Sequence, residues 1–265
     1  MFNPRPQRAR WQAAVRRNVL GLLVGLSACV RLAGAAGAGG DAWQEEVLLH
    51  DGRTIVVDRS QTYGGGHEIG QRPPERDMTI SFTLPGSGKR ITWFSEYGDD
   101  LGRSNFRLAA LHVLNDTPYV VALPNLCLSY NKWGRPNPPY VIFKYQGNAW
   151  SRIPMAELPV EFKSTNLVVE NFNNAAEFTR LGRLSAEKVK QLNGQLSEPG
   201  YREILREPIA GSGEWCEQTF PNGKGRALGS GWFKLNKDMA GCMRVCQQYD
   251  YGAALCPCNK FFREE

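Results

Sequence analysis

The fold of this chain is decided first by residues 47–57, Val47-Leu48-Leu49-His50-Asp51-Gly52-Arg53-Thr54-Ile55-Val56-Val57. Apolar and β-branched residues flank an Asp-Gly pair, which is the strongest short-range signal for the tight turn of a β-hairpin. We therefore predict two antiparallel strands that meet at Asp51 and Gly52.

Three more hairpins are predicted downstream, where apolar segments flank short turn sequences. Their strands are residues 79–84 and 90–94, 111–114 and 119–122, and 140–145 and 149–153. A mainly β domain of antiparallel hairpins is therefore expected over residues 45–170, in the form of a twisted sheet, a sandwich or a partial propeller.

A helical pattern appears only after this region, in residues 171–210. Ser185 is a candidate N-cap, and Pro199-Gly200 ends the helix. The apolar residues that recur on one face are Val189, Leu192 and Leu196. We expect this short helical segment to pack on the β domain, and residues 211–265 to form a loop, as far as Gly231, and a disulfide-rich tail.

Residues 1–28 have the pattern of a signal peptide of the lipoprotein type. Five arginines and no acidic residue occur there, followed by a short apolar run. Arg31 interrupts that run well before the about 20 apolar residues that a membrane-spanning helix needs. The sequence Leu26-Ser27-Ala28-Cys29 has the form of a lipobox, which predicts a lipid on Cys29 and a flexible tether over residues 29–44.

Two alternatives to lipidation remain open. Small residues at alternate positions of residues 33–38 suit ordinary signal-peptidase cleavage, which releases a soluble periplasmic or secreted protein. The third possibility is that the apolar segment stays uncleaved as an anchor. We expect export to the periplasm and membrane anchoring by lipid.

The positive charge of the chain is concentrated in this signal. The whole sequence has 32 Lys and Arg, 26 Asp and Glu and a formal net charge of +6, but five of the basic residues lie in residues 1–28. The rest of the chain is nearly neutral and has no basic stripe with interleaved aromatic residues. We therefore expect no nucleic-acid partner.

Six cysteines remain when Cys29 is set aside for the lipid, and an oxidising compartment allows them to form disulfides. They are Cys127, Cys216, Cys242, Cys246, Cys256 and Cys258. Cys242 and Cys246 share one face of a helix, and the Cys256-Pro257-Cys258 segment can fold back to meet them. We predict a disulfide-stapled hairpin whose pairing stays open.

A four-thiolate zinc site is the alternative for the last four cysteines. Such sites use paired cysteines with two to four intervening residues, a spacing that Cys242 and Cys246 satisfy and that Cys256 and Cys258 do not. Disulfides are therefore favoured, no metal is predicted, and no motif in the chain predicts a cofactor.

The densest group of candidate binding residues lies in residues 130–140. Prolines hold such a loop open, and Tyr, Trp, Arg and Asn bind sugars and peptides by stacking and hydrogen bonding. The candidates are Tyr130, Trp133, Arg135, Asn137 and Tyr140. The alternative is a rigid connector whose aromatic residues cap the sheet.

Candidates for catalysis are few, because the chain has only three histidines. His50 lies beside a turn and His112 lies in a strand, where structural roles are typical. His67 follows three glycines and precedes Glu68, so a pliant loop presents an imidazole and a carboxylate together as a possible general base. A solvated loop without chemistry is the alternative.

Three segments resemble a family of uncharacterised exported proteins of proteobacteria. They are residues 58–65, 68–74 and 130–145, and the likeness covers about residues 45–209. The resemblance implies export and carries no activity or catalytic residue.

The sequence as a whole indicates a non-enzymatic envelope protein with a binding or structural role. We expect it to meet the membrane through its lipid and to bind an envelope protein or polysaccharide through residues 130–140. The alternative is an envelope hydrolase that acts from the His67 loop.

Overall fold

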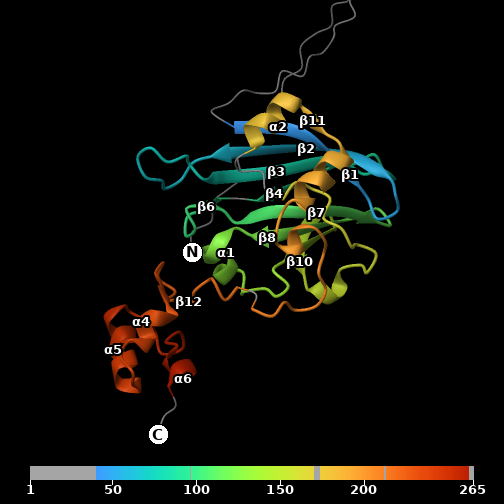
Figure 1. Ribbon diagram of the computed structural model, residues 1–265. Helices are drawn as coiled ribbons and strands as arrows, with labels where there is room; N and C mark the ends of the chain where they lie inside the picture. Colours follow the sequence, from blue (N-terminus) through green and yellow to red (C-terminus); the bar gives the residue numbers. More distant parts are fainter. Residues whose placement is uncertain (1–39, 96, 170–173, 212, 263–265) are drawn as a thin grey trace, which may run out of the picture. The chain divides into compact units, whose positions relative to one another are not determined.

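The computed structural model describes residues 40–95, 97–169, 174–211 and 213–262, which belong to one structural unit. They form two main β-sheets, several short helices and a Cys-rich C-terminal part (Figure 1). The mainly antiparallel β fold predicted from the sequence is confirmed. The predicted signal peptide, Cys29 and residues 29–39 of the predicted tether lie outside the described residues.

The first sheet has the strand order β11-β1-β2-β3-β4. Its strands are β1 (Gly40–Leu48), β2 (Thr54–Tyr63), β3 (Glu75–Thr83), β4 (Arg90–Ser95) and β11 (Arg183–Leu184). The hairpins predicted around Asp51-Gly52 and around residues 85–88 are confirmed by antiparallel pairing of β1 with β2 and of β3 with β4. Gly52 has φ +83°, a backbone conformation that the turn requires and that residues with a Cβ atom rarely adopt.

The second sheet has the order β10-β9-β8-β7. Its strands are β7 (Phe106–Leu114), β8 (Thr117–Pro124), β9 (Val141–Gln146) and β10 (Ala149–Ile153). The other two predicted hairpins are confirmed here, β7 with β8 and β9 with β10. In the sequence, β4 and β7 are separated by a small antiparallel ribbon of β5 (Tyr97–Gly98) and β6 (Arg103–Ser104).

The main core lies between the two sheets, which face each other in Figure 1. The first sheet contributes Val57, Ile80, Phe82, Ile91 and Trp93, and the second contributes Leu108, Leu111, Val113, Val120 and Val141. A second core covers the opposite face of the second sheet, where Phe162 and Ile204 pack on Val121 and Ile142. The second sheet is therefore buried on both faces, which is why its strands are almost continuously apolar.

The predicted helical segment consists of α2 (Ala175–Leu181), α3 (Ala186–Gly194) and the short turn η2 (Pro199–Tyr201). Ser185 is the N-cap of α3, since its hydroxyl accepts a hydrogen bond from the amide of Lys188. Phe178 and Val189 pack with Trp43 of β1. The helix ends at Gly194, so Leu196, expected on its apolar face, lies beyond it and packs on the second core instead.

Two boundaries differ from the sequence prediction. Residues 40–44, expected in the flexible tether, belong to β1, because β2 is long enough to pair as far back as Gly40 and because Trp43 is buried. The segment 211–231, expected to be a loop, contains the hairpin of β12 (Thr219–Pro221) and β13 (Ala227–Gly229). Its short strands bury Phe220 and Leu228, too few residues for a periodic signal.

The C-terminal part has a core of its own, formed by Phe220, Phe233, Val245 and Tyr251 with the cysteines. Its helices are α4 (Ser230–Lys234), α5 (Met239–Gln248) and α6 (Cys258–Phe261). The predicted disulfide staple is confirmed, and its pairs are Cys242–Cys258 and Cys246–Cys256. Residues 217–262, which we call the tail module, contain all of these elements.

A buried ion pair crosses the inner face of the first sheet. Arg59 of β2 donates to the Glu45 carboxylate of β1 at 2.8 Å, and both side chains are almost fully buried. The same carboxylate accepts the Trp43 indole N–H at 2.7 Å and the Val168 amide at 3.0 Å. Both charges are thus paired and hydrogen-bonded, as burial requires.

Replacement of Glu45 by Gln should lower the free energy of unfolding by about 3–5 kcal/mol, because it leaves the Arg59 guanidinium buried without a counter-charge. Chemical denaturation measures this loss. The matched control is Asp58→Asn in the exposed Arg90–Asp58 pair of the same sheet, which should cost about 0–1 kcal/mol. Equal losses in the two variants would contradict a structural role for the buried pair.

Candidate functional site

A disulfide joins the end of the second sheet to a segment far along the chain. Cys127 lies in α1 (Leu126–Lys132), which follows β8, and it is bonded to Cys216 with the Cα atoms 5.1 Å apart. The two cysteines are 89 residues apart in sequence. This cross-link holds residues 213–217 against α1.

Side chains of α1 and of the following loop reinforce the cross-link. Arg135 donates to the carbonyl oxygens of Gly213 at 2.8 Å and Cys216 at 3.0 Å. Asn131 donates to the Glu217 carbonyl at 2.9 Å and accepts the Thr219 amide at 3.1 Å. The polar groups of this loop therefore bind the main chain of the Cys216 segment.

Trp133 and Asn137, two further candidates of residues 130–140, also make their contacts within the protein. Trp133 packs on Phe106 and donates its indole N–H to Asn105 at 3.2 Å. Asn137 exchanges two hydrogen bonds with the main chain of Ile209. These contacts match the rigid connector weighed from the sequence, and α1 extends through Lys132 where an open loop was expected.

Tyr140 is buried at the end of the same loop. Its hydroxyl lies 3.0 Å from the carbonyl oxygens of Gly200 and Glu203, and burial raises its pKa to about 12. It therefore serves as a neutral hydrogen-bonding group that fixes residues 200–205 beside the second sheet.

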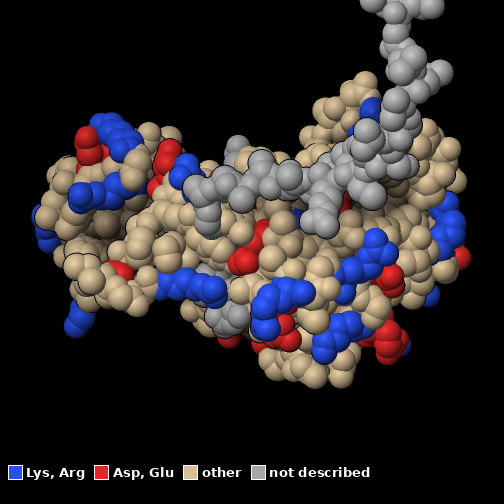
Figure 2. All heavy atoms as spheres, turned by 90° about the horizontal axis from the view of Figure 1, so that it is seen from above, with Lys and Arg blue, Asp and Glu red and all other residues tan. Residues whose placement is uncertain are grey.

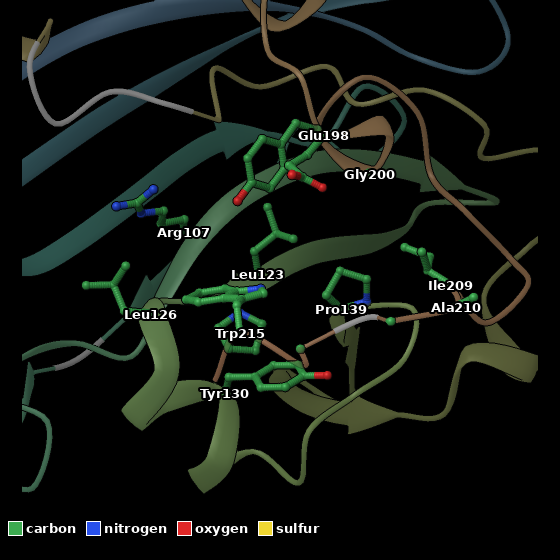
Figure 3. A pocket seen from close by; sticks show the side chains of 14 residues that line it. Arg107, Leu123, Leu126, Tyr130, Pro139, Glu198, Gly200, Ile209, Ala210 and Trp215 are labelled. Atoms are coloured by element: carbon green, nitrogen blue, oxygen red, sulfur yellow. The ribbon is translucent and has the colours of Figure 1, made fainter. Parts of the chain in front are cut away.

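These connections leave a cavity of about 350 Å³ between α1 and the segment from Glu198 to Trp215. Figure 3 shows the ring of Trp215 among Leu123, Leu126 and Tyr130, which line the same cavity. Glu198, Tyr201 and Arg107 complete its polar lining. Trp215 is 73% exposed, which is unusual for the largest apolar side chain.

The backbone around the cavity is constrained at two positions. Leu126 has φ +66°, a conformation that residues with side chains seldom adopt and that recurs at functional sites. Gly213 has φ +72°, and a Cβ there would collide with the ring of Tyr130. The close approach of the Gly213 main chain to Tyr130 therefore depends on glycine.

The sequence indicated Tyr130 as a site residue but missed Trp215, Tyr201 and Glu198. These three lie outside the aromatic-rich segment, in stretches whose composition is that of ordinary loops. The signal available in the sequence was the adjacency of Trp215 to Cys216, since a half-cystine holds its neighbour in place.

The His67 loop is exposed, and its two candidate groups are held by different partners. The imidazole Nδ1 lies 2.9 Å from the Gly65 carbonyl oxygen, and the Glu68 carboxylate accepts a hydrogen bond from Gln71 at 3.2 Å. The described side-chain hydrogen bonds of His67 and Glu68 therefore go to other residues and not to each other.

The other two histidines lie near each other in the second core. His112 stacks on Phe162 with ring centroids 4.6 Å apart, and His50 lies 6.2 Å from His112 by the same measure. His112 Nε2 lies 3.1 Å from the Ser164 carbonyl oxygen. Burial lowers the pKa of His112 to about 4, so this side chain is neutral at ordinary pH.

Charged side chains of both signs are interspersed on the face that Figure 2 shows, as the nearly neutral composition after residue 28 leads one to expect.

Within the described ranges, every helix is too short or too polar to cross a membrane. No family model, no curated protein and no solved structure matches this chain.

We expect stability to fall as the pH is lowered from 6.5 to about 4, because unfolded His112 takes up a proton in this window and the folded side chain does not. The contribution of this residue is at most about 3 kcal/mol. Thermal unfolding across this range should therefore be less pH-dependent in His112→Gln, whose amide can still donate to Ser164. Parallel curves for the two proteins would contradict this role for His112.

Proposed function

We propose that this chain is an exported, non-enzymatic envelope protein that binds a polysaccharide in the cavity beside Trp215. In this proposal residues 1–28 direct export, a lipid on Cys29 holds the protein at the membrane, and the two-sheet domain presents the cavity to the envelope. The proposal joins the signal pattern of the sequence to the geometry of the cavity.

The observation that carries the proposal is the position of Trp215. Trp215 is 73% exposed and lines the cavity, so its indole offers an apolar surface that a bound ligand can cover. The neighbouring Cys216 is bonded to α1, which limits the entropy that Trp215 loses when it contacts a ligand.

A polysaccharide suits the lining of the cavity better than a small apolar ligand. A sugar ring has an apolar C–H face and a rim of hydroxyl groups, so it needs aromatic faces next to hydrogen-bonding groups. Trp215 and the half-buried Tyr201 supply the rings, and Glu198 supplies an exposed carboxylate.

The cysteine pairing supports the export half of the proposal. The three disulfides use all six cysteines that follow Cys29, which leaves Cys29 as the one cysteine available for a lipid. Disulfides persist in oxidising compartments such as the periplasm.

Trp215→Ala should weaken binding to immobilised envelope polysaccharides about tenfold, because it removes the exposed stacking face. Retention of the purified protein on each polysaccharide measures the effect. The control is Trp232→Ala, which removes a second exposed tryptophan from the tail module. The proposal fails if the wild-type protein binds no polysaccharide in the panel, or if both variants lose binding equally.

Expression of the full chain in a bacterial host should yield a mature N-terminus at Cys29 that carries a diacylglyceryl group, and Cys29→Ala should abolish it. Mass spectrometry of the N-terminal peptide reads this directly. A free N-terminus between Ala35 and Gly39 would instead show release by signal peptidase and refute the anchor.

A further inference from the structure

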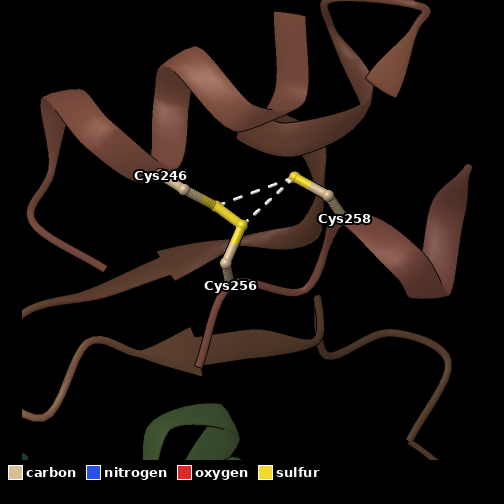
Figure 4. A group of neighbouring side chains, drawn as sticks. All are labelled: Cys246, Cys256 and Cys258. Atoms are coloured by element: carbon tan, nitrogen blue, oxygen red, sulfur yellow. Dashed lines mark hydrogen bonds between the residues drawn. A yellow bond between two sulfur atoms is a disulfide. The ribbon is translucent and has the colours of Figure 1, made fainter. Parts of the chain in front are cut away.

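The two disulfides of the tail module lie against each other. Cys242 and Cys246 extend from one face of α5, one turn apart, and Cys256 and Cys258 flank Pro257. Figure 4 shows Cys258 beside the Cys246–Cys256 bond, with its sulfur 3.4 Å from that of Cys256 and 3.7 Å from that of Cys246.

These separations are close to those of a metal-thiolate centre. Zinc binds thiolate sulfur at about 2.3 Å, so two sulfurs of a tetrahedral site are about 3.8 Å apart. The sulfurs of Cys246, Cys256 and Cys258 all lie within 4.8 Å of one another. The sulfur of Cys242 is bonded to that of Cys258, so reduction of this bond and a small rotation bring a fourth ligand to the group.

We infer that the tail module is a redox-switched zinc site, in which Cys242, Cys246, Cys256 and Cys258 form two disulfides when oxidised and ligate one Zn²⁺ when reduced. Each disulfide takes two electrons and two protons from a dithiol, which is itself oxidised to a disulfide. Zn²⁺ then replaces the four thiol protons, which leave to water, and four thiolates surround the metal.

The surroundings of the cysteines suit both states. Cys256 is half-buried whereas the other three are at most 2% exposed, so a reductant reaches the Cys246–Cys256 bond at the Cys256 sulfur first. Attack on the Cys256 sulfur releases the Cys246 thiolate, whose sulfur lies 3.7 Å from that of Cys258 in the second disulfide. A site of four thiolates and one Zn²⁺ carries two negative charges, and residues 217–262 contain six Lys and Arg against three Asp and Glu.

Either state can hold the module together. The core of these residues is small, and domains of this size depend on disulfides or a structural metal. Both arrangements attach α5 to the segment around Pro257, so the switch exchanges one cross-link for another. The inference is independent of the cavity beside Trp215.

The test uses the full chain, reduced by a phosphine without oxygen and then given Zn²⁺ alone. Native mass spectrometry should show one Zn²⁺ per chain, and hydrogen exchange should show that α5, unprotected in the reduced metal-free chain, regains protection. The oxidised chain should bind none.

Two variants locate the site. Cys29→Ala combined with Cys127→Ser and Cys216→Ser keeps only the tail cysteines and should bind Zn²⁺ as the wild-type chain does. Cys256→Ser with Cys258→Ser should lose binding. The inference is overturned if the reduced wild-type chain binds no Zn²⁺, if the second variant binds equally, or if binding restores no protection to α5.

Discussion

The Cys127–Cys216 disulfide is the constraint on which the cavity beside Trp215 depends. It joins α1, at the end of β8, to a segment 89 residues later, and it thereby closes the longest covalent loop in the described chain. The cross-link holds Trp215, the neighbour of Cys216, in one wall of the cavity. The tail module begins directly after Cys216. Arg135 and Asn131 add hydrogen bonds that fix the orientation of the joined segment as well as its position.

Buried polar groups give the two-sheet core its alignment. Asn166 donates to the Leu48 carbonyl of the first sheet and to the Leu111 carbonyl of the second, and its own carbonyl accepts the Leu111 amide. The Glu45–Arg59 pair binds Val168 two residues later. Hydrophobic burial is non-directional and allows many arrangements of the two sheets. These hydrogen bonds form only when the sheets and the segment with Asn166 and Val168 are aligned in one way.

The composition of the segment 130–140 predicted a binding loop, whereas its side chains make contacts within the protein. Its Tyr, Trp, Arg and Asn residues are the groups that bind ligands in many proteins, but here they bind the main chain of residues 200–219. The cavity that results is lined partly by this segment, through Tyr130 and Pro139, and partly by residues that no local pattern distinguishes. The space beside this loop, and not the loop itself, is therefore the proposed binding site.

The sequence by itself determined the local features of this protein. These features are the four hairpins, the Ser185 cap and the shared helical face of Cys242 and Cys246. Each depends on residues a few positions apart, so local turn sequences and periodicity predict it. Only the tertiary structure decided the pairing of Cys127 with Cys216, the extension of β1 back to Gly40, the buried Glu45–Arg59 pair and the exposure of Trp215. Each of these depends on which distant segments meet, and the free energy that selects them comes from burial summed over the whole fold, which no local window of sequence contains.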